Sequence, residues 1–127
     1  MKTFFANWFF FAVRLLFWLT LVVVAVLSLW PGDAHPPTSP WSDKFGHGLA
    51  YFVLGLQWIV GWFGSLRNWL IGLAVLWLYS GLMEMVQATA IIGRTASGAD
   101  LLANGAGLLL ALACGLLIRS RLAKSKS

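Results

Sequence analysis

Four long runs of apolar residues, separated by short polar stretches, dominate the pattern of the chain. They extend over residues 15–30, 49–63, 69–86 and 101–118. Each approaches or reaches the roughly 20 residues that a helix needs to cross a hydrocarbon core of about 30 Å. No alternating strand pattern competes with them, and helices satisfy their backbone hydrogen bonds internally. The pattern predicts an all-α membrane protein, a bundle of four transmembrane helices.

Proline, glycine and serine mark the predicted connections. Ser39 followed by Pro40 is typical of a helix N-cap and first helical position, so the second helix should start there and continue to about residue 63. The third helix is predicted from about residue 69 to residue 87 and the fourth from near residue 100, with turns over 64–68 and 89–97. A cleaved signal peptide is the competing interpretation of the first run. That run is longer than the roughly 7–15 apolar residues usual in signal peptides and lacks a small-residue cleavage site before Pro31, which favours an uncleaved helix.

Composition supports a single membrane domain spanning residues 1–127. Hydrophobic residues make up 60% of the chain and charged residues 10%, which excludes a water-soluble domain. Much of the net charge of +5 lies in a basic tail, residues 119–127, directly after the last apolar run. Such a tail is typical of a topology signal that also contacts anionic lipid. We therefore expect membrane lipids as partners and no nucleic acid. The lone Cys114 excludes an intrachain disulfide.

The basic residues are divided unequally between the two sides of the predicted bundle. Four spans place both termini on one side, and only Lys44 and Arg94 fall on the other. The basic residues on the side of the termini are Lys2, Arg14, Arg67, Arg119, Arg121, Lys124 and Lys126. The positive-inside rule therefore predicts that both termini are cytoplasmic. All four acidic residues and both histidines then lie at or near the outer face of the membrane.

A stripe of small residues predicts close helix packing in the fourth helix. Ala103, Gly107, Ala111 and Gly115 recur every four residues, which lets another backbone approach. Asp100 and Asn104 extend the same face toward the start of the helix. In the second helix, Gly48 and Gly55 lack side chains, so the face that carries His47 and Tyr51 is also less bulky. The polar groups should therefore face the interior of the bundle.

The second helix carries a polar face near its start. Asp43, His47 and Tyr51 follow one another at intervals of four, so they share one side of the helix. Asp43 is also explained by the positive end of a helix, and Lys44 by contact with lipid headgroups. His47 is explained less well in this way, because an imidazole that faces the interior of a membrane bundle needs a partner.

The third helix contributes Glu84 and, one turn later, Gln87. A carboxylate inside an apolar helix is expensive unless it is paired or protonated, and such residues are functional candidates by default. An interhelical hydrogen bond that only holds helices together is the alternative.

The turn before the fourth helix, and that helix's first turns, supply the remaining candidates. Ser97 and Asp100 have the spacing of a capping box, which alone could account for Asp100 but not for Asn104, one turn deeper. Arg94 is either a solvated loop residue or, beside Lys44, part of a cationic pocket suited to phosphate or carboxylate.

Taken together, these residues resemble the VanZ-like family of small bacterial membrane proteins. They occur as Asp43-Lys44-x-x-His47-x-x-x-Tyr51, Glu84-x-x-Gln87, Arg94 and Asp100-x-x-x-Asn104-x-x-Gly107. The resemblance covers residues 43–107, and Gly48 departs from it because a bulky residue often follows the histidine in that family. It implies a location in the bacterial cytoplasmic membrane and a link to resistance of the teicoplanin type, but no settled reaction.

The first hypothesis is a protein that binds or acts on a phosphorylated lipid of the cell envelope. Lys44 and Arg94 would hold the anionic group, while His47, Glu84 and Asp100 would transfer a proton. The other residues predicted to line the ligand site are Asp43, Tyr51, Gln87 and Asn104.

Two further hypotheses stay open. The polar network could be non-catalytic and hold the bundle together, with the protein acting through a membrane-protein partner. A divalent metal on His47, Asp43, Glu84 and Asp100 is the third, and it ranks last because Lys44 and Arg94 would oppose a cation. We therefore expect no metal and no cofactor, and leave open whether the protein is an enzyme.

Overall fold

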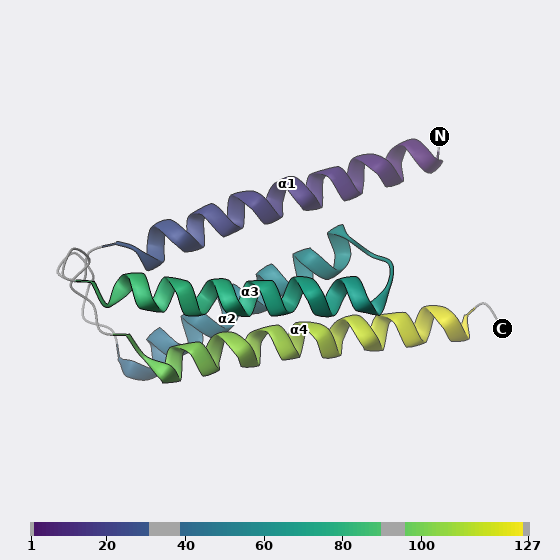
Figure 1. Cartoon of the computed structure of the whole chain (residues 1–127). Helices are drawn as coiled ribbons and strands as arrows, with labels where there is room; N and C mark the ends of the chain where they lie inside the picture. The colour runs from purple at the N-terminus through teal and green to yellow at the C-terminus, as the bar shows by residue number, and fades with distance from the viewer. Residues whose placement is uncertain (1, 31–38, 90–95, 126–127) are drawn as a thin grey trace.

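The computed structural model describes residues 2–30, 39–89 and 96–125, and the described residues fold into four helices. These are α1 (Lys2–Ser28), α2 (Pro40–Gly61), α3 (Leu66–Gln87) and α4 (Gly98–Lys124). Consecutive helices run in opposite directions, and both chain termini lie at the same end of the molecule (Figure 1). We call this the terminal end and the opposite end, where α2 and α4 begin, the far end.

Serine N-caps fix where three of the helices begin. Ser39 accepts a hydrogen bond from Ser42 N at 3.2 Å, and the predicted start of the second helix is confirmed. Ser97 Oγ likewise accepts from Asp100 N at 3.3 Å. The predicted turn over 64–68 is too long, because Ser65 caps α3 and the helix begins at residue 66. A serine cap thus outweighs the polar character of the residues that follow it.

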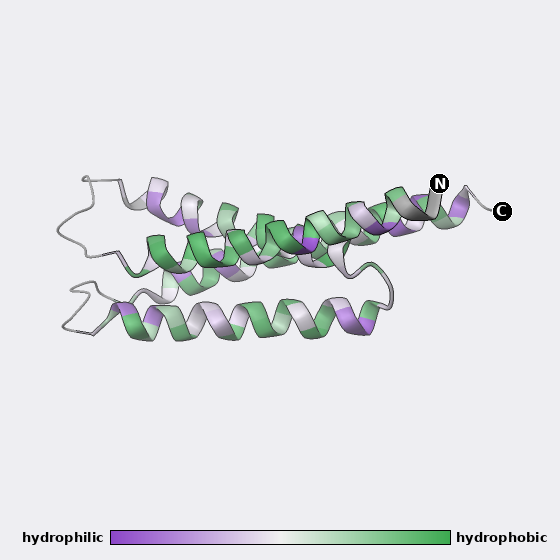
Figure 2. Ribbon diagram, turned by 90° about the horizontal axis from the view of Figure 1, so that it is seen from above, coloured by the Kyte–Doolittle hydropathy of each residue, from purple (hydrophilic) through white to green (hydrophobic). Residues whose placement is uncertain are grey.

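Within the described residues, three helices have the length and apolar character of a membrane span. They are Phe5–Ser28, Leu66–Gln87 and Gly98–Lys124. The 22 residues of α2, at a rise of 1.5 Å each, measure about 33 Å, similar to the ~30 Å core of a bilayer. It is not among the three because Asp43, Lys44 and His47 interrupt its apolar sequence near its start. Figure 2 shows hydrophobic residues along most of the helical surface, with polar residues more frequent near helix ends.

Helix α2 makes the most extensive contacts with the rest of the bundle. It packs against α1, α3 and α4, most extensively against α4. Tyr51, Leu54 and Ile59 of α2 form the centre of the core. The other helices contribute Phe17, Trp69, Leu73, Leu76, Leu108 and Ala111. Polar side chains on α2 therefore meet protein on several sides, as interior polar groups in a membrane bundle require.

Glycine allows α2 and α4 to run side by side in the same direction. A Cβ added at Gly107 would collide with the backbone oxygen of Gly48 and would lie 2.9 Å from Phe52 N. Further along, a Cβ at Gly55 would lie 2.8 Å from Ala111 Cβ. The predicted close approach along the small-residue stripe is confirmed, and the approaching helix is α2. Because the two helices are parallel and this close, their first turns meet at the far end.

Candidate functional site

Four side chains meet at the far end of the bundle, and we call them the far-end cluster: Asp43, Lys44 and His47 of α2 with Asp100 of α4. Lys44 Nζ lies 3.1 Å from Asp100 Oδ1 and forms an ion pair with it. His47 Nε2 faces the other carboxylate oxygen, Oδ2, at 3.9 Å. One ligand atom each of Asp43, His47 and Asp100 lie within 4.8 Å of one another. The cluster therefore combines two carboxylates, an ammonium and an imidazole from two helices.

The position of Asp100 follows from the start of α4. Its backbone N–H is held by the Ser97 cap, so the residue lies in the first helical turn, where a carboxylate is favoured by the helix dipole. The carboxylate is buried, at 6% exposure. A buried carboxylate needs charged or hydrogen-bonding partners, and Lys44 provides one across the α2–α4 interface. The lysine itself is only half-buried, so its ammonium remains accessible.

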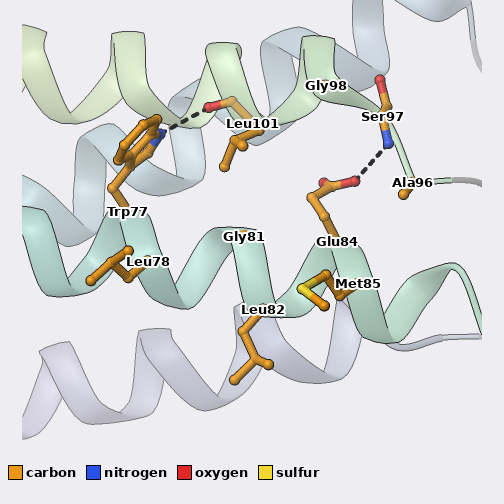
Figure 3. Close-up of a pocket in the computed structure, with 10 residues that line it drawn as sticks. All are labelled: Trp77, Leu78, Gly81, Leu82, Glu84, Met85, Ala96, Ser97, Gly98 and Leu101. Carbon is orange, nitrogen blue, oxygen red and sulfur yellow. Dashed lines mark hydrogen bonds between the residues drawn. The ribbon is translucent and has the colours of Figure 1, made fainter.

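Glu84 of α3 is also buried and has a backbone partner. Its Oε2 accepts a hydrogen bond from Ser97 N at 3.0 Å, so α3 holds the N-cap residue of α4 (Figure 3). The carboxylate borders an apolar groove of about 510 Å³ that is lined by Trp77, Leu78, Leu82, Met85 and Leu101, among others. This hydrogen bond joins two helices. It is the alternative to a catalytic role that the sequence left open for Glu84.

Gln87 lies one turn beyond Glu84 and contacts a different helix. Its Nε2 donates to the backbone oxygen of Ser28 at 2.8 Å, so it ties the end of α3 to the end of α1. Gln87 is 2% exposed and has its partner away from the far-end cluster. A role for Gln87 in ligand binding stays a prediction, and the structure gives it a position between α1 and α3.

Tyr51 and Asn104 lie one turn deeper than His47 and Asp100 on the same helices. Both side chains are buried, at 2% exposure each. Asn104 Oδ1 accepts no hydrogen bond from the described residues. The interior polar groups thus extend inward from the cluster rather than ending at it.

The sequence hypothesis placed all these polar groups in one ligand site. The structure brings Asp43, Lys44, His47 and Asp100 together, whereas Glu84 is joined to them only through the first turn of α4. Neither the groove beside Glu84 nor the one beside Lys44 is lined by both residues. The reason is that α2 and α4 pack closely at their starts, while Glu84 reaches the backbone of residue 97 from the third helix. Arg94, the second predicted anion-binding residue, lies outside the described residues.

Sequence reasoning did not predict the groove beside Lys44. It runs between α2 and α4, has a volume of about 730 Å³ and includes Lys44 among its lining residues near the start of α2. Its walls are Trp41, Phe45, Gly48, Leu49 and Phe52 of α2 with Ala103, Ala106, Gly107 and Leu110 of α4. Two features of the sequence could have indicated this groove. One is the stripe of small residues, which leaves space beside α4, and the other is the pair of aromatic residues at the start of the second helix. We call it the α2–α4 groove.

Two arginines at the terminal end also have contacts that the sequence did not indicate. Arg14 Nε donates to the Gly61 oxygen at 2.8 Å, and its guanidinium lies 5.3 Å from the ring centroid of Trp62. Arg119 donates to Gly64 O at 3.3 Å in the same region. Arg14 thus binds a backbone carbonyl in the last turn of α2, where the carbonyls lack a helical N–H partner.

Comparisons of the chain with models of known protein families, with curated proteins and with solved structures found no match. Inferences about function therefore rest on the geometry of the far-end cluster and of the α2–α4 groove.

Proposed function

We propose that the chain is a four-span protein of the bacterial cytoplasmic membrane, similar to the VanZ-like family, that binds a phosphorylated lipid of the cell envelope. In this proposal both termini are cytoplasmic and the far-end cluster faces outward. The shared end of the two termini supports it, as does the position of Arg67, Arg119 and Arg121 at that end. The length of α2, close to the thickness of the hydrocarbon core, supports a fourth span.

The α2–α4 groove is the observation that carries the proposal. Its walls are almost entirely apolar along the helices, and the half-buried Lys44 stands at one end. A lipid has the complementary shape, with a long apolar chain and a charged headgroup at one end. Lys44 has three N–H donors and gives one of them to Asp100, so a lipid phosphate could accept from the others. The groove thus matches both parts of an anionic lipid.

The neighbouring residues support chemistry on the headgroup. His47 Nε2 faces Asp100 Oδ2 at 3.9 Å, and the other oxygen of the same carboxylate binds Lys44. Such a pair can give a proton to a phosphate oxygen or a leaving group and take it back. Binding is the first part of the proposal, and turnover of the bound lipid is a separate outcome of the same experiment.

The test is equilibrium binding of a labelled polyprenyl phosphate, polyprenyl pyrophosphate or the neutral polyprenol to the full chain in phosphatidylcholine nanodiscs. We expect the phosphorylated lipids to bind more tightly than the alcohol. Lys44→Gln should weaken phosphate binding about 10- to 100-fold, since a hydrogen bond to a charged group contributes about 1.5–3 kcal/mol. Lys44→Arg should retain most of the affinity.

A groove variant separates the tail from the headgroup. Leu110→Trp places a large ring in the α2–α4 groove and should weaken binding of the phosphate and the alcohol alike. Leu117→Trp is the matched control, because Leu117 is exposed on the same helix and does not line the groove. Equal binding of phosphate and alcohol by the wild type, unchanged in Lys44→Gln, would refute the proposal.

A scaffold role is the second candidate, and the partners of Glu84 and Gln87 favour it. Both buried side chains bind backbone atoms of neighbouring helices, as groups do when they join helices. On this view the protein acts through a membrane-protein partner. The two functions differ in Glu84→Gln, which keeps an acceptor for the Ser97 N–H. The scaffold function predicts that any phenotype of this variant follows its loss of stability.

A further inference from the structure

The spacing of three side chains in the far-end cluster fits a metal ion better than direct contact. His47 Nε2 and Asp100 Oδ2 are 3.9 Å apart, beyond the range of a hydrogen bond. Two ligands that each bind one ion at about 2.0–2.2 Å can stand up to roughly 4 Å apart. One ligand atom each of Asp43, His47 and Asp100 lie within 4.8 Å of one another, so small side-chain movements suffice to bring three ligands to one ion.

The two oxygens of Asp100 have separate surroundings. Oδ1 accepts from Lys44 Nζ at 3.1 Å, whereas Oδ2 faces His47. Lys44 therefore does not occupy the position between the imidazole and the carboxylate. In metal sites, a donor on the outer oxygen of a ligand carboxylate fixes its orientation. The lysine, which the sequence alone set against a metal, takes this outer position in the structure.

A second, independent observation comes from Asn104. Its Oδ1 is buried and accepts no hydrogen bond from the described residues. Asn104 lies one turn after Asp100 on the same face of α4, and helical side chains lean toward the N-terminus of their helix, here toward Asp100. A buried carbonyl oxygen without a donor is unfavourable unless another partner satisfies it. A cation held by Asp100 would provide such a partner, directly or through a water.

The charge of the cluster also favours a cation. Two carboxylates, Asp43 and Asp100, meet one ammonium, Lys44, so the acidic side chains outnumber the fixed positive charge. An excess of carboxylates attracts a divalent cation, and the bound ion would add positive charge beside Lys44 for an anionic group. The open coordination positions of an ion with three protein ligands are suited to water or to a phosphate oxygen.

We infer that Asp43, His47 and Asp100 bind one divalent transition-metal ion, zinc or manganese, with Asn104 supporting the site. One imidazole nitrogen with carboxylate oxygens suits these ions. The inference rests on the geometry of the cluster and not on lipid binding. Only the further step, in which a lipid phosphate completes the coordination, rests on the proposed function.

The experiment is a metal titration of the full chain, purified in detergent, stripped with chelator and free of added lipid. Zn²⁺ and Mn²⁺ are titrated separately by isothermal calorimetry, and bound metal is counted after gel filtration. We expect one ion per chain. Co²⁺ is added as a spectroscopic probe, because ligation by His47 and carboxylates gives visible absorption bands. A wild-type chain that retains no zinc or manganese after gel filtration would overturn the inference without any variant.

Variants assign the site. His47→Gln should weaken metal binding at least tenfold, and Asn104→Ala should weaken it roughly tenfold, as supporting groups do. His35→Ala is the matched control, because His35 is the other histidine of the sequence, and binding should be unchanged. Unchanged affinity in His47→Gln overturns the site, and unchanged affinity in Asn104→Ala overturns the role of that residue. Metal binding without lipid binding refutes only the proposed function, and lipid binding that persists in chelator without metal binding refutes only this inference.

Discussion

The close approach of α2 and α4 at Gly107 gives the sharpest prediction. Gly107→Ala adds a Cβ where the backbone oxygen of Gly48 and the backbone nitrogen of Phe52 already lie. Neither atom belongs to a side chain that can rotate away, so α2 and α4 must separate. Adding a methyl group to a packed core costs about 1–3 kcal/mol, and a clash with backbone belongs at the upper end of this range. We expect the free energy of unfolding to fall by about 2–3 kcal/mol.

Gly46→Ala is the matched control. Gly46 lies on α2 with nothing within 4 Å of an added Cβ, so the same substitution should be neutral or stabilising through helix propensity. Both variants are unfolded in mixed micelles with increasing denaturing detergent and followed by circular dichroism. Separation of the helices should also weaken lipid and metal binding, because both depend on the contact between their first turns. A Gly107→Ala chain as stable as wild type would refute the close approach of the two helices.

Three further predictions concern individual contacts. Lys44→Met leaves the buried Asp100 carboxylate without its ammonium partner and should destabilise the fold by about 1–3 kcal/mol. The double variant with Asp100→Leu should recover much of this stability. Additive effects of the two substitutions in a double-mutant cycle would exclude the ion pair. Glu84→Leu should cost about 1–3 kcal/mol because it leaves the Ser97 N–H unpaired, whereas Glu84→Gln should cost less; equal losses in denaturation experiments would contradict the hydrogen bond. Arg14→Leu removes a hydrogen bond and a cation–π contact at the end of α2, so we expect a loss of about 1–2 kcal/mol and altered tryptophan fluorescence; no change in either would argue against both contacts.

The sequence determined the elements of this protein. Runs of apolar residues predicted the four helices, and local serine caps set the starts of α2 and α4. The small-residue stripe of α4 predicted a close helix contact on the face that carries Asp100 and Asn104. Periodicity, capping and small residues are local properties, because each depends on residues within a few positions of one another along one helix.

The tertiary structure decided the partners. The rotation and axial offset of the helices relative to one another determine three contacts. They are the approach of α4 to α2, the binding of Lys44 to Asp100, and the hydrogen bond of Glu84 to the Ser97 backbone. Spacing along one chain contains no information on these offsets, so the sequence grouped Glu84 with His47 in a single hollow. Side chains on different helices meet only where packing places their backbones, and in this protein the missing Cβ atoms of Gly48 and Gly107 set that placement.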